Sequence, residues 1–65
     1  MEDIATQARR EIAEMQEALA NAAVELEKSI KGNKAACTRV RKELLFVAQM
    51  GTSCRKTISN LKATL

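Results

Sequence analysis

Apolar residues recur at alternating steps of three and four through almost the whole of this 65-residue chain. Such steps align apolar side chains along one face of an α-helix and come close to the heptad repeat of coiled coils. In the first half the row is Ala5, Ala8, Ile12, Met15, Leu19, Ala22, Leu26 and Ile30. In the second half it is Cys37, Val40, Leu44, Val47, Gly51, Cys54, Ile58, Leu61 and Leu65. The pattern predicts two long amphipathic helices and an all-α fold.

One break separates the two patterns, the sequence KGN at residues 31–33. Gly32 can adopt the left-handed conformation that ends a helix, and Asn33 can cap the amides that begin the next one. So short a connection makes the two helices antiparallel neighbours. We therefore predict a single domain over residues 1–65, an antiparallel αα-hairpin with helices at about 3–31 and 34–64 and a turn at 32–33.

In such a hairpin, residues whose numbers sum to about 64 lie level with each other, given the turn at 32–33. We expect the two apolar rows to face each other, so that Ile12 lies opposite Gly51 or Cys54. Cys37 and Cys54 are 17 positions apart on one helix, about 25 Å, so they cannot bond to each other. We expect both cysteines to be small core residues; the alternative is a disulfide between subunits.

A chain of this length buries little apolar surface, so one hairpin needs further support. Two cysteines and no histidine make a disulfide framework or a zinc site a poor remedy. The stretch LLFVAQM at 44–50 is apolar on more than one side of its helix, which is typical of an interface. We expect two hairpins to pair as a four-helix bundle; the alternative is a fold-back that covers one side only. The expected dimer interface comprises Leu44, Leu45, Phe46, Val47 and Met50.

Charge is divided unequally between the halves. Residues 1–32 carry four cations and seven acids, a formal charge of −3, whereas residues 33–65 carry seven cations and one acid, a charge of +6. This asymmetry indicates a polyanionic partner, although it could also serve pairing between the halves or be a solvated face. The amides that open the second helix, beside Lys34, Ala35 and Ala36, are expected to be accessible to a phosphate.

No aromatic residue lies among the cations, which disfavours stacking on bases. The sequence therefore favours double-stranded DNA, bound through its phosphates and without sequence preference. The candidate DNA-binding residues are Lys31, Lys34, Arg39, Arg41, Lys42, Arg55 and Lys56, with Arg9 and Arg10 in support. The rival from another class is a structural coiled-coil adaptor whose basic face docks an acidic protein.

Several other functions lack the residues that they need. The chain has no histidine, no glycine-rich phosphate loop and no Cys/His pair, so we expect neither an enzyme nor a cofactor. Glu11, Glu14 and Glu17 are expected to form a solvated helix face rather than a metal site. No apolar run of about 18 residues and no secretion signal are present, so we expect no membrane span and a cytoplasmic location.

A resemblance to a known family lies in residues 31–62, KGNKAACTRVRKELLFVAQMGTSCRKTISNLK. This segment resembles the amino-terminal region of the chlamydial linker-histone-like proteins and their bacterial relatives. The matching features are the GNKAA turn, the RVR that follows and the RK pair at 55–56. The resemblance implies a nucleoid-associated protein that binds and compacts DNA, whose helical part contributes self-association. The first half matches only as a generic amphipathic helix.

Those relatives continue into a long tail rich in Lys, Ala and Pro that dominates their DNA binding, whereas this sequence ends at Leu65 without one. Either the helical body itself binds DNA, or the chain is a dimerisation domain. The sequence leaves open whether two or four subunits associate, and whether the DNA is bent, bridged or wrapped.

Overall fold

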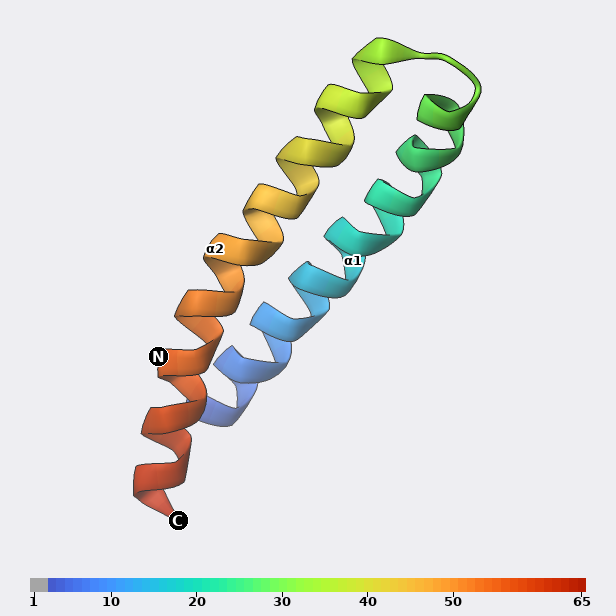
Figure 1. Cartoon of the computed structure of the whole chain (residues 1–65). Helices are drawn as coiled ribbons and strands as arrows, with labels where there is room; N and C mark the ends of the chain where they lie inside the picture. The colour runs from blue at the N-terminus through green and yellow to red at the C-terminus, as the bar shows by residue number, and fades with distance from the viewer. Residues whose placement is uncertain (1–2) are drawn as a thin grey trace.

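The computed structural model describes residues 3–65, so the first two residues of the predicted domain lie outside it. Helix α1 spans Ile4–Ile30 and helix α2 spans Lys34–Thr64. The helices run side by side in opposite directions, and the start of α1 lies near the end of α2 (Figure 1). Together they form a rod of 49 × 17 × 15 Å. Within residues 3–65 neither helix is apolar enough over a sufficient length to cross a membrane. The all-α antiparallel hairpin predicted from the sequence is confirmed.

Local side-chain chemistry explains where the helices begin and end. The Asp3 carboxylate accepts a hydrogen bond of 2.7 Å from the Thr6 amide and so caps the start of α1. Gly32 has a φ of +101°, the left-handed conformation that ends a helix. The side-chain oxygen of Asn33 then accepts a hydrogen bond of 3.1 Å from the Ala36 amide and caps α2. The turn is therefore built as the KGN sequence predicts.

Two side-chain contacts between the helices establish which residues lie level. The side-chain amide of Gln7 donates a hydrogen bond to the Thr57 hydroxyl at 3.5 Å. The Arg39 guanidinium donates one to the Glu25 carboxylate at 2.8 Å. In both pairs the residue numbers sum to 64. The residues of α1 and α2 that lie side by side are thus those expected from a turn at residues 32–33.

The contact between α1 and α2, which we call the seam, is made mostly by small side chains. Its buried apolar residues are Ala8, Ala18, Ala22, Ala36 and Cys54. Half-buried Met15, Val40, Val47, Met50 and Leu61 also lie along it. No large side chain is fully buried among the residues that the structure describes. A single hairpin therefore has only a thin apolar core.

The seam contains only part of the apolar pattern from which it was predicted. Of the predicted residues, those in the seam are Ala8, Met15, Ala22, Val40, Val47, Cys54 and Leu61. On α1, Ala18 is buried, whereas the neighbouring Leu19 is 48% exposed. That part of the prediction was wrong because the row of Ile4, Glu11, Ala18 and Glu25 takes this place in the seam. Glu25 pairs with Arg39 of α2 there, and the small Ala18 lets the helix axes approach closely. The predicted seam residues that lie exposed instead are Ile12, Leu19, Leu26, Ile30, Cys37, Leu44, Ile58 and Leu65.

The same shift overturns two expectations about polar and small residues. Glu11, expected on a solvated face, is only 5% exposed, and its Oε1 atom has no hydrogen-bond partner. Cys54 is buried as expected, but Cys37 is exposed. Both corrections follow from the seam, because positions 11 and 54 belong to the rows that face the other helix and position 37 does not.

Candidate nucleic-acid interface

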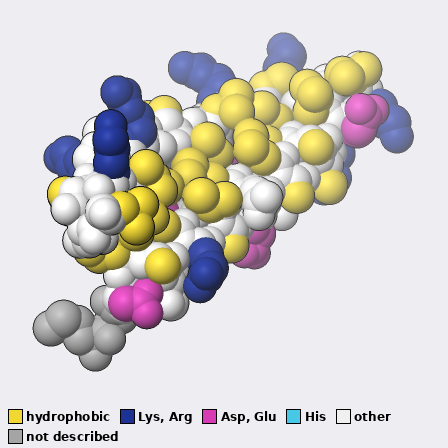
Figure 2. Space-filling model, turned by 90° about the horizontal axis from the view of Figure 1, so that it is seen from below, with side chains coloured by type: hydrophobic (Ala, Val, Ile, Leu, Met, Phe, Trp, Pro, Cys, Tyr) yellow, Lys and Arg dark blue, Asp and Glu magenta, His cyan; other side chains and the backbone are white. Residues whose placement is uncertain are grey.

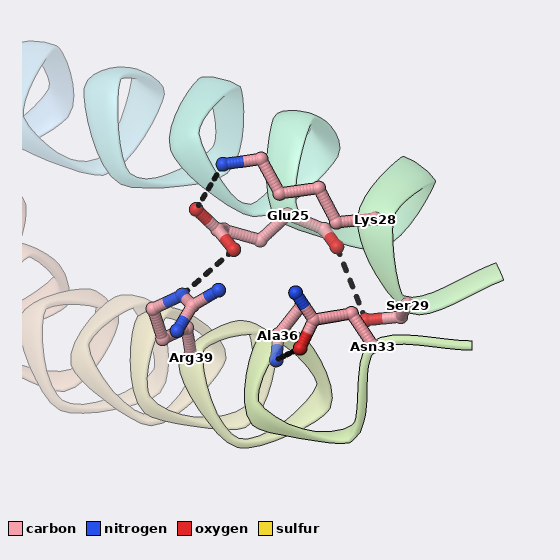
Figure 3. A network of polar contacts seen from close by, with 6 residues as sticks. All are labelled: Glu25, Lys28, Ser29, Asn33, Ala36 and Arg39. Atoms are coloured by element: carbon pink, nitrogen blue, oxygen red, sulfur yellow. Dashed lines mark hydrogen bonds and ion pairs between the residues drawn. The ribbon is translucent and has the colours of Figure 1, made fainter. Parts of the chain in front are cut away.

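An ion-pair cluster at the turn end of the hairpin engages one of the candidate DNA-binding residues (Figure 3). The Glu25 carboxylate accepts a hydrogen bond of 2.8 Å from Arg39 Nε and contacts Lys28 Nζ at 3.4 Å. The hydrogen bond from Arg39 and then that from Lys28 hold the pKa of Glu25 below its ordinary value. Arg39 therefore links α2 to α1, and it does so rather than pairing with Glu43 on its own helix.

The start of α2 is less open to a phosphate than the sequence suggested. Ala36 is fully buried, and its amide already donates to the Asn33 side chain. The expectation that this amide would be accessible was wrong, since the capping residue occupies it. Lys34 and Ala35 are exposed.

One side of α2 packs against α1, and this determines which side faces solvent. The residues of α2 that are buried or half-buried along the seam are Ala36, Val40, Glu43, Val47, Met50, Cys54, Thr57 and Leu61. They form two adjacent rows with intervals of seven, as in a heptad repeat. The residues on the opposite side of the helix therefore point away from α1.

Most of the cations of α2 lie on that opposite side. Lys34, Arg41, Arg55 and Lys62 share one row because their numbers differ by multiples of seven, and Lys42 and Lys56 share another. Between these rows run Thr38, Leu45, Thr52 and Ser59, all exposed. We call this surface the outer face of α2; it comprises Lys34, Thr38, Arg41, Lys42, Leu45, Thr52, Arg55, Lys56, Ser59 and Lys62. Lys62 was not a candidate from the sequence, although its interval of seven from Arg55 was a signal for it.

The outer face of α2 carries no acidic residue. The one acid of this helix, Glu43, is half-buried at the seam, where it lines a hollow with Asn21 and Arg39. Within residues 3–65 the structure gives none of the six outer-face cations an acidic partner. Their charge is therefore uncompensated and open to solvent.

The candidates on α1 lie elsewhere. Arg10 pairs with Glu14 one turn along the same helix, at 3.3 Å. Arg9 and Lys31 are exposed, and neither belongs to the outer face of α2. The structure thus brings five of the nine candidates together, Lys34, Arg41, Lys42, Arg55 and Lys56, and places Arg39, Arg9, Arg10 and Lys31 outside this group.

The residues expected at a dimer interface do not share one surface. Val47 and Met50 are half-buried at the seam, and Leu45 lies on the outer face of α2. Phe46 lines a hollow with Glu14, Glu17, Ala18, Asn21 and Glu43. Leu44 lies on the other side of the seam from Phe46, in the same row as Ile58.

One broad side of the hairpin is apolar along its length. On each helix, one row of residues comes directly after a row of the seam. On α1 it is Ala5, Ile12, Leu19 and Leu26, and on α2 it is Cys37, Leu44, Gly51 and Ile58. In antiparallel helices, this offset puts both rows on the same side, which we call the apolar face. Figure 2 shows hydrophobic side chains gathered in a continuous band along the molecule, with Lys and Arg at its edges. Sequence reasoning assigned these residues to the seam and so missed this surface.

Comparison with known proteins places the chain in a family. The family model described as histone H1-like protein Hc1 matches residues 9–64, which include most of α1, the whole of α2 and every cation of the outer face. Searches of curated proteins and of solved structures gave no match. The family match confirms the resemblance noted in residues 31–62 and extends it through the first helix. The chain therefore belongs to the Hc1 family of histone H1-like proteins.

Proposed function

We propose that the chain is a protein of the bacterial nucleoid that binds double-stranded DNA through its phosphates, without sequence preference. The observation that carries this proposal is the outer face of α2, where six exposed cations lie together and none has an acidic partner within residues 3–65. Membership of a histone H1-like family supports DNA as the polyanion.

The chemistry of this face matches a phosphate backbone. Lys and Arg side chains displace the counterions condensed on DNA, which is the main source of non-specific affinity. Thr38 and Ser59 add hydroxyl donors of the kind that phosphate oxygens accept, whereas the Thr52 hydroxyl donates to the Ala48 carbonyl at 3.3 Å. The row from Lys34 to Lys62 is about 42 Å long at 1.5 Å per residue, and so longer than one turn of DNA, about 34 Å. Aromatic side chains are absent from the face, so base stacking has no platform there.

Compaction of DNA requires particles that make more than one DNA contact. We infer that the chain reaches this state as a homo-oligomer, since the hairpin leaves the apolar face uncovered and buries no large side chain fully within residues 3–65. A second copy would cover that surface and would also double the number of basic faces.

A salt titration of DNA binding tests the proposal. Arg41→Gln with Arg55→Gln removes two cations of the outer face, and Arg10→Gln with Lys28→Gln removes the same charge from residues that pair with Glu14 and Glu25. Fluorescence anisotropy with a random-sequence duplex measures the slope of log affinity against log salt concentration. The outer-face pair should lower the magnitude of the slope by about 1.8, at 0.9 per phosphate contact, and the control pair should change it little. Equal slopes for both pairs would contradict the assignment of this face.

The alternative partner is an acidic protein docked by the same cations. Competition separates the two, because duplex DNA should displace a labelled duplex at far lower concentrations than polyglutamate of equal charge. The opposite ranking would favour the adaptor. The family match favours DNA.

A further inference from the structure

The apolar face is large enough to form a specific interface. Its residues Ile12, Leu19, Leu26, Leu44 and Ile58 are each 43 to 49% exposed. The broad side of the rod measures 49 × 17 Å, so a second copy covering its whole length would bury on the order of 800 Å² per copy, the size of a standard protein interface. Exposed apolar side chains over this area favour association with another apolar surface, because the core of the hairpin is thin. A second copy presents a surface of the same length and chemistry.

A hollow in the apolar face marks where a side chain from outside would be received. It surrounds Gly51 and is lined by Met15, Ala48, Cys54 and Ile58, with Thr52, Arg55 and Ser59 at its outer edge. A Cβ atom built on Gly51 would meet nothing within 4 Å, so the missing side chain leaves open space on this side of α2. The large residue of the apolar face nearest this level on α1 is Ile12.

Charge determines which helix of the second copy can lie against α2. The outer edge of the apolar face on α2 is the row of Lys34, Arg41, Arg55 and Lys62, whereas the equivalent edge on α1 is Arg9, Gln16, Ala23 and Ile30. Packing α2 against the α2 of a second copy would bring two rows of cations together. Packing it against α1 of that copy meets a single cation, Arg9. The second arrangement is therefore favoured, and it requires a twofold axis along the rod, with both turns at the same end.

Side-chain sizes agree with this arrangement. Because levels are preserved by rotation about the long axis, Ile12 of one copy lies level with Gly51 of the other to within one residue. In the same way Leu26 lies level with Cys37, and Ala5 lies level with Ile58. Large side chains thus oppose small ones, with Leu19 opposite Leu44 as the one pair of equal size.

From these observations we infer that the chain forms a dimer through its apolar face, with the two turns at the same end and Ile12 of each copy seated against Gly51 of the other. In this dimer the two α2 helices lie on a diagonal, and their outer faces point in opposite directions. If the outer face of α2 binds DNA as proposed, the dimer binds one duplex on each of two opposite sides. It therefore links two duplexes and does not hold a single duplex between its subunits.

Sedimentation equilibrium of size-altered variants tests the contact. Gly51→Leu places a side chain in the hollow, where its Cβ meets nothing within 4 Å, so helix content should be retained. The dimer dissociation constant should rise by about tenfold or more. Ser53→Leu adds the same side chain on the opposite side of the seam and should leave the constant unchanged. Ile12→Ala combined with Gly51→Leu should restore much of the association. A monomeric wild type, or equal effects of the two leucines, would overturn the contact.

A distance measurement tests the orientation. A spin label on Lys31→Cys, in a chain with Cys37→Ser and Cys54→Ala, reports the separation of the two turns. The inferred dimer predicts a short distance across the bundle. A distance approaching the 49 Å length of the rod would mean that the turns lie at opposite ends and would overturn the inference.

Bridging is measured by retention of a labelled duplex on beads that carry a second duplex. Wild-type protein should retain it, whereas Gly51→Leu should lose retention and still bind a single duplex at low salt. Binding by the wild type without bridging would overturn the dimer geometry alone. Failure of the wild type to bind any duplex would instead overturn the proposed function.

Discussion

Glu11 is a carboxylate buried at the seam. It lies in the contact between α1 and α2, is only 5% exposed, and its Oε1 atom has no hydrogen-bond partner in the described structure. A buried polar atom that loses its water without gaining a partner lowers the stability of the folded state. We therefore expect Glu11 to lower the stability of the hairpin.

Replacing this carboxylate should stabilise the protein. Glu11→Leu removes the unpartnered oxygen and adds apolar volume at the seam, so the free energy of unfolding should rise by on the order of 1 kcal/mol. Urea denaturation followed by circular dichroism measures it. Glu17→Leu, at an exposed position of the same helix, is the control and should change stability by less than about 0.5 kcal/mol. A loss of stability in Glu11→Leu would show that the carboxylate has a favourable interaction.

At the scale of the elements, the two helices are joined at the turn end by a charged contact between Glu25 and Arg39. The lowered pKa of Glu25 means that its charged form is favoured in the folded state, first by the hydrogen bond from Arg39. Stability from this contact is therefore fully present above the ordinary glutamate value of 4.5 and is lost as pH falls through the lower folded pKa.

Thermal unfolding as a function of pH should reveal this contact. The wild-type midpoint should fall as the pH drops below 4.5, and Glu25→Gln should show a shallower fall in that range. Asp3 should contribute in the same direction below 3.8 in both proteins, because hydrogen bonds from Thr6 lower its pKa. Identical profiles for the two proteins would show that the Glu25 contact contributes nothing to folding.

At the scale of the whole molecule, the hairpin leaves most of its large apolar side chains outside the seam. Its buried apolar residues are alanines and one cysteine, while leucines and isoleucines lie exposed on the apolar face. If a second copy covers that face, folding and association are linked by mass action.

The stability of the chain should therefore depend on its concentration. The thermal midpoint of the wild type should rise steadily as protein concentration increases over two decades, while that of Gly51→Leu should respond much less. Differential scanning calorimetry at several concentrations measures both. A wild-type midpoint that stays constant would show that the hairpin is stable as a monomer.

Many of the cations in the candidate site could be predicted, because the charge of each residue and the helical periodicity can be read directly from the sequence. Arg41, Arg55 and Lys56 were predicted as candidates from their charge and their level along the hairpin, and all three lie on the outer face of α2. Their neighbour Arg39 was identified with equal reason, yet the structure engages it with Glu25 across the seam. Whether a cation faces solvent or the other helix depends on how α2 is rotated about its own axis, and composition carries no information about that rotation.

The sequence by itself determined the two helices, their turn and their level relation, because these depend on local chemistry: the steps of three and four, the left-handed Gly32 and the capping Asn33. Only the tertiary structure decided which apolar row became the seam. Two adjacent rows on α1 satisfy the same period, and the choice between them depends on how closely two backbones can approach. The row that contains the small Ala18 allows the closer approach, so the larger Ile12, Leu19 and Leu26 remain outside and are available to a second copy.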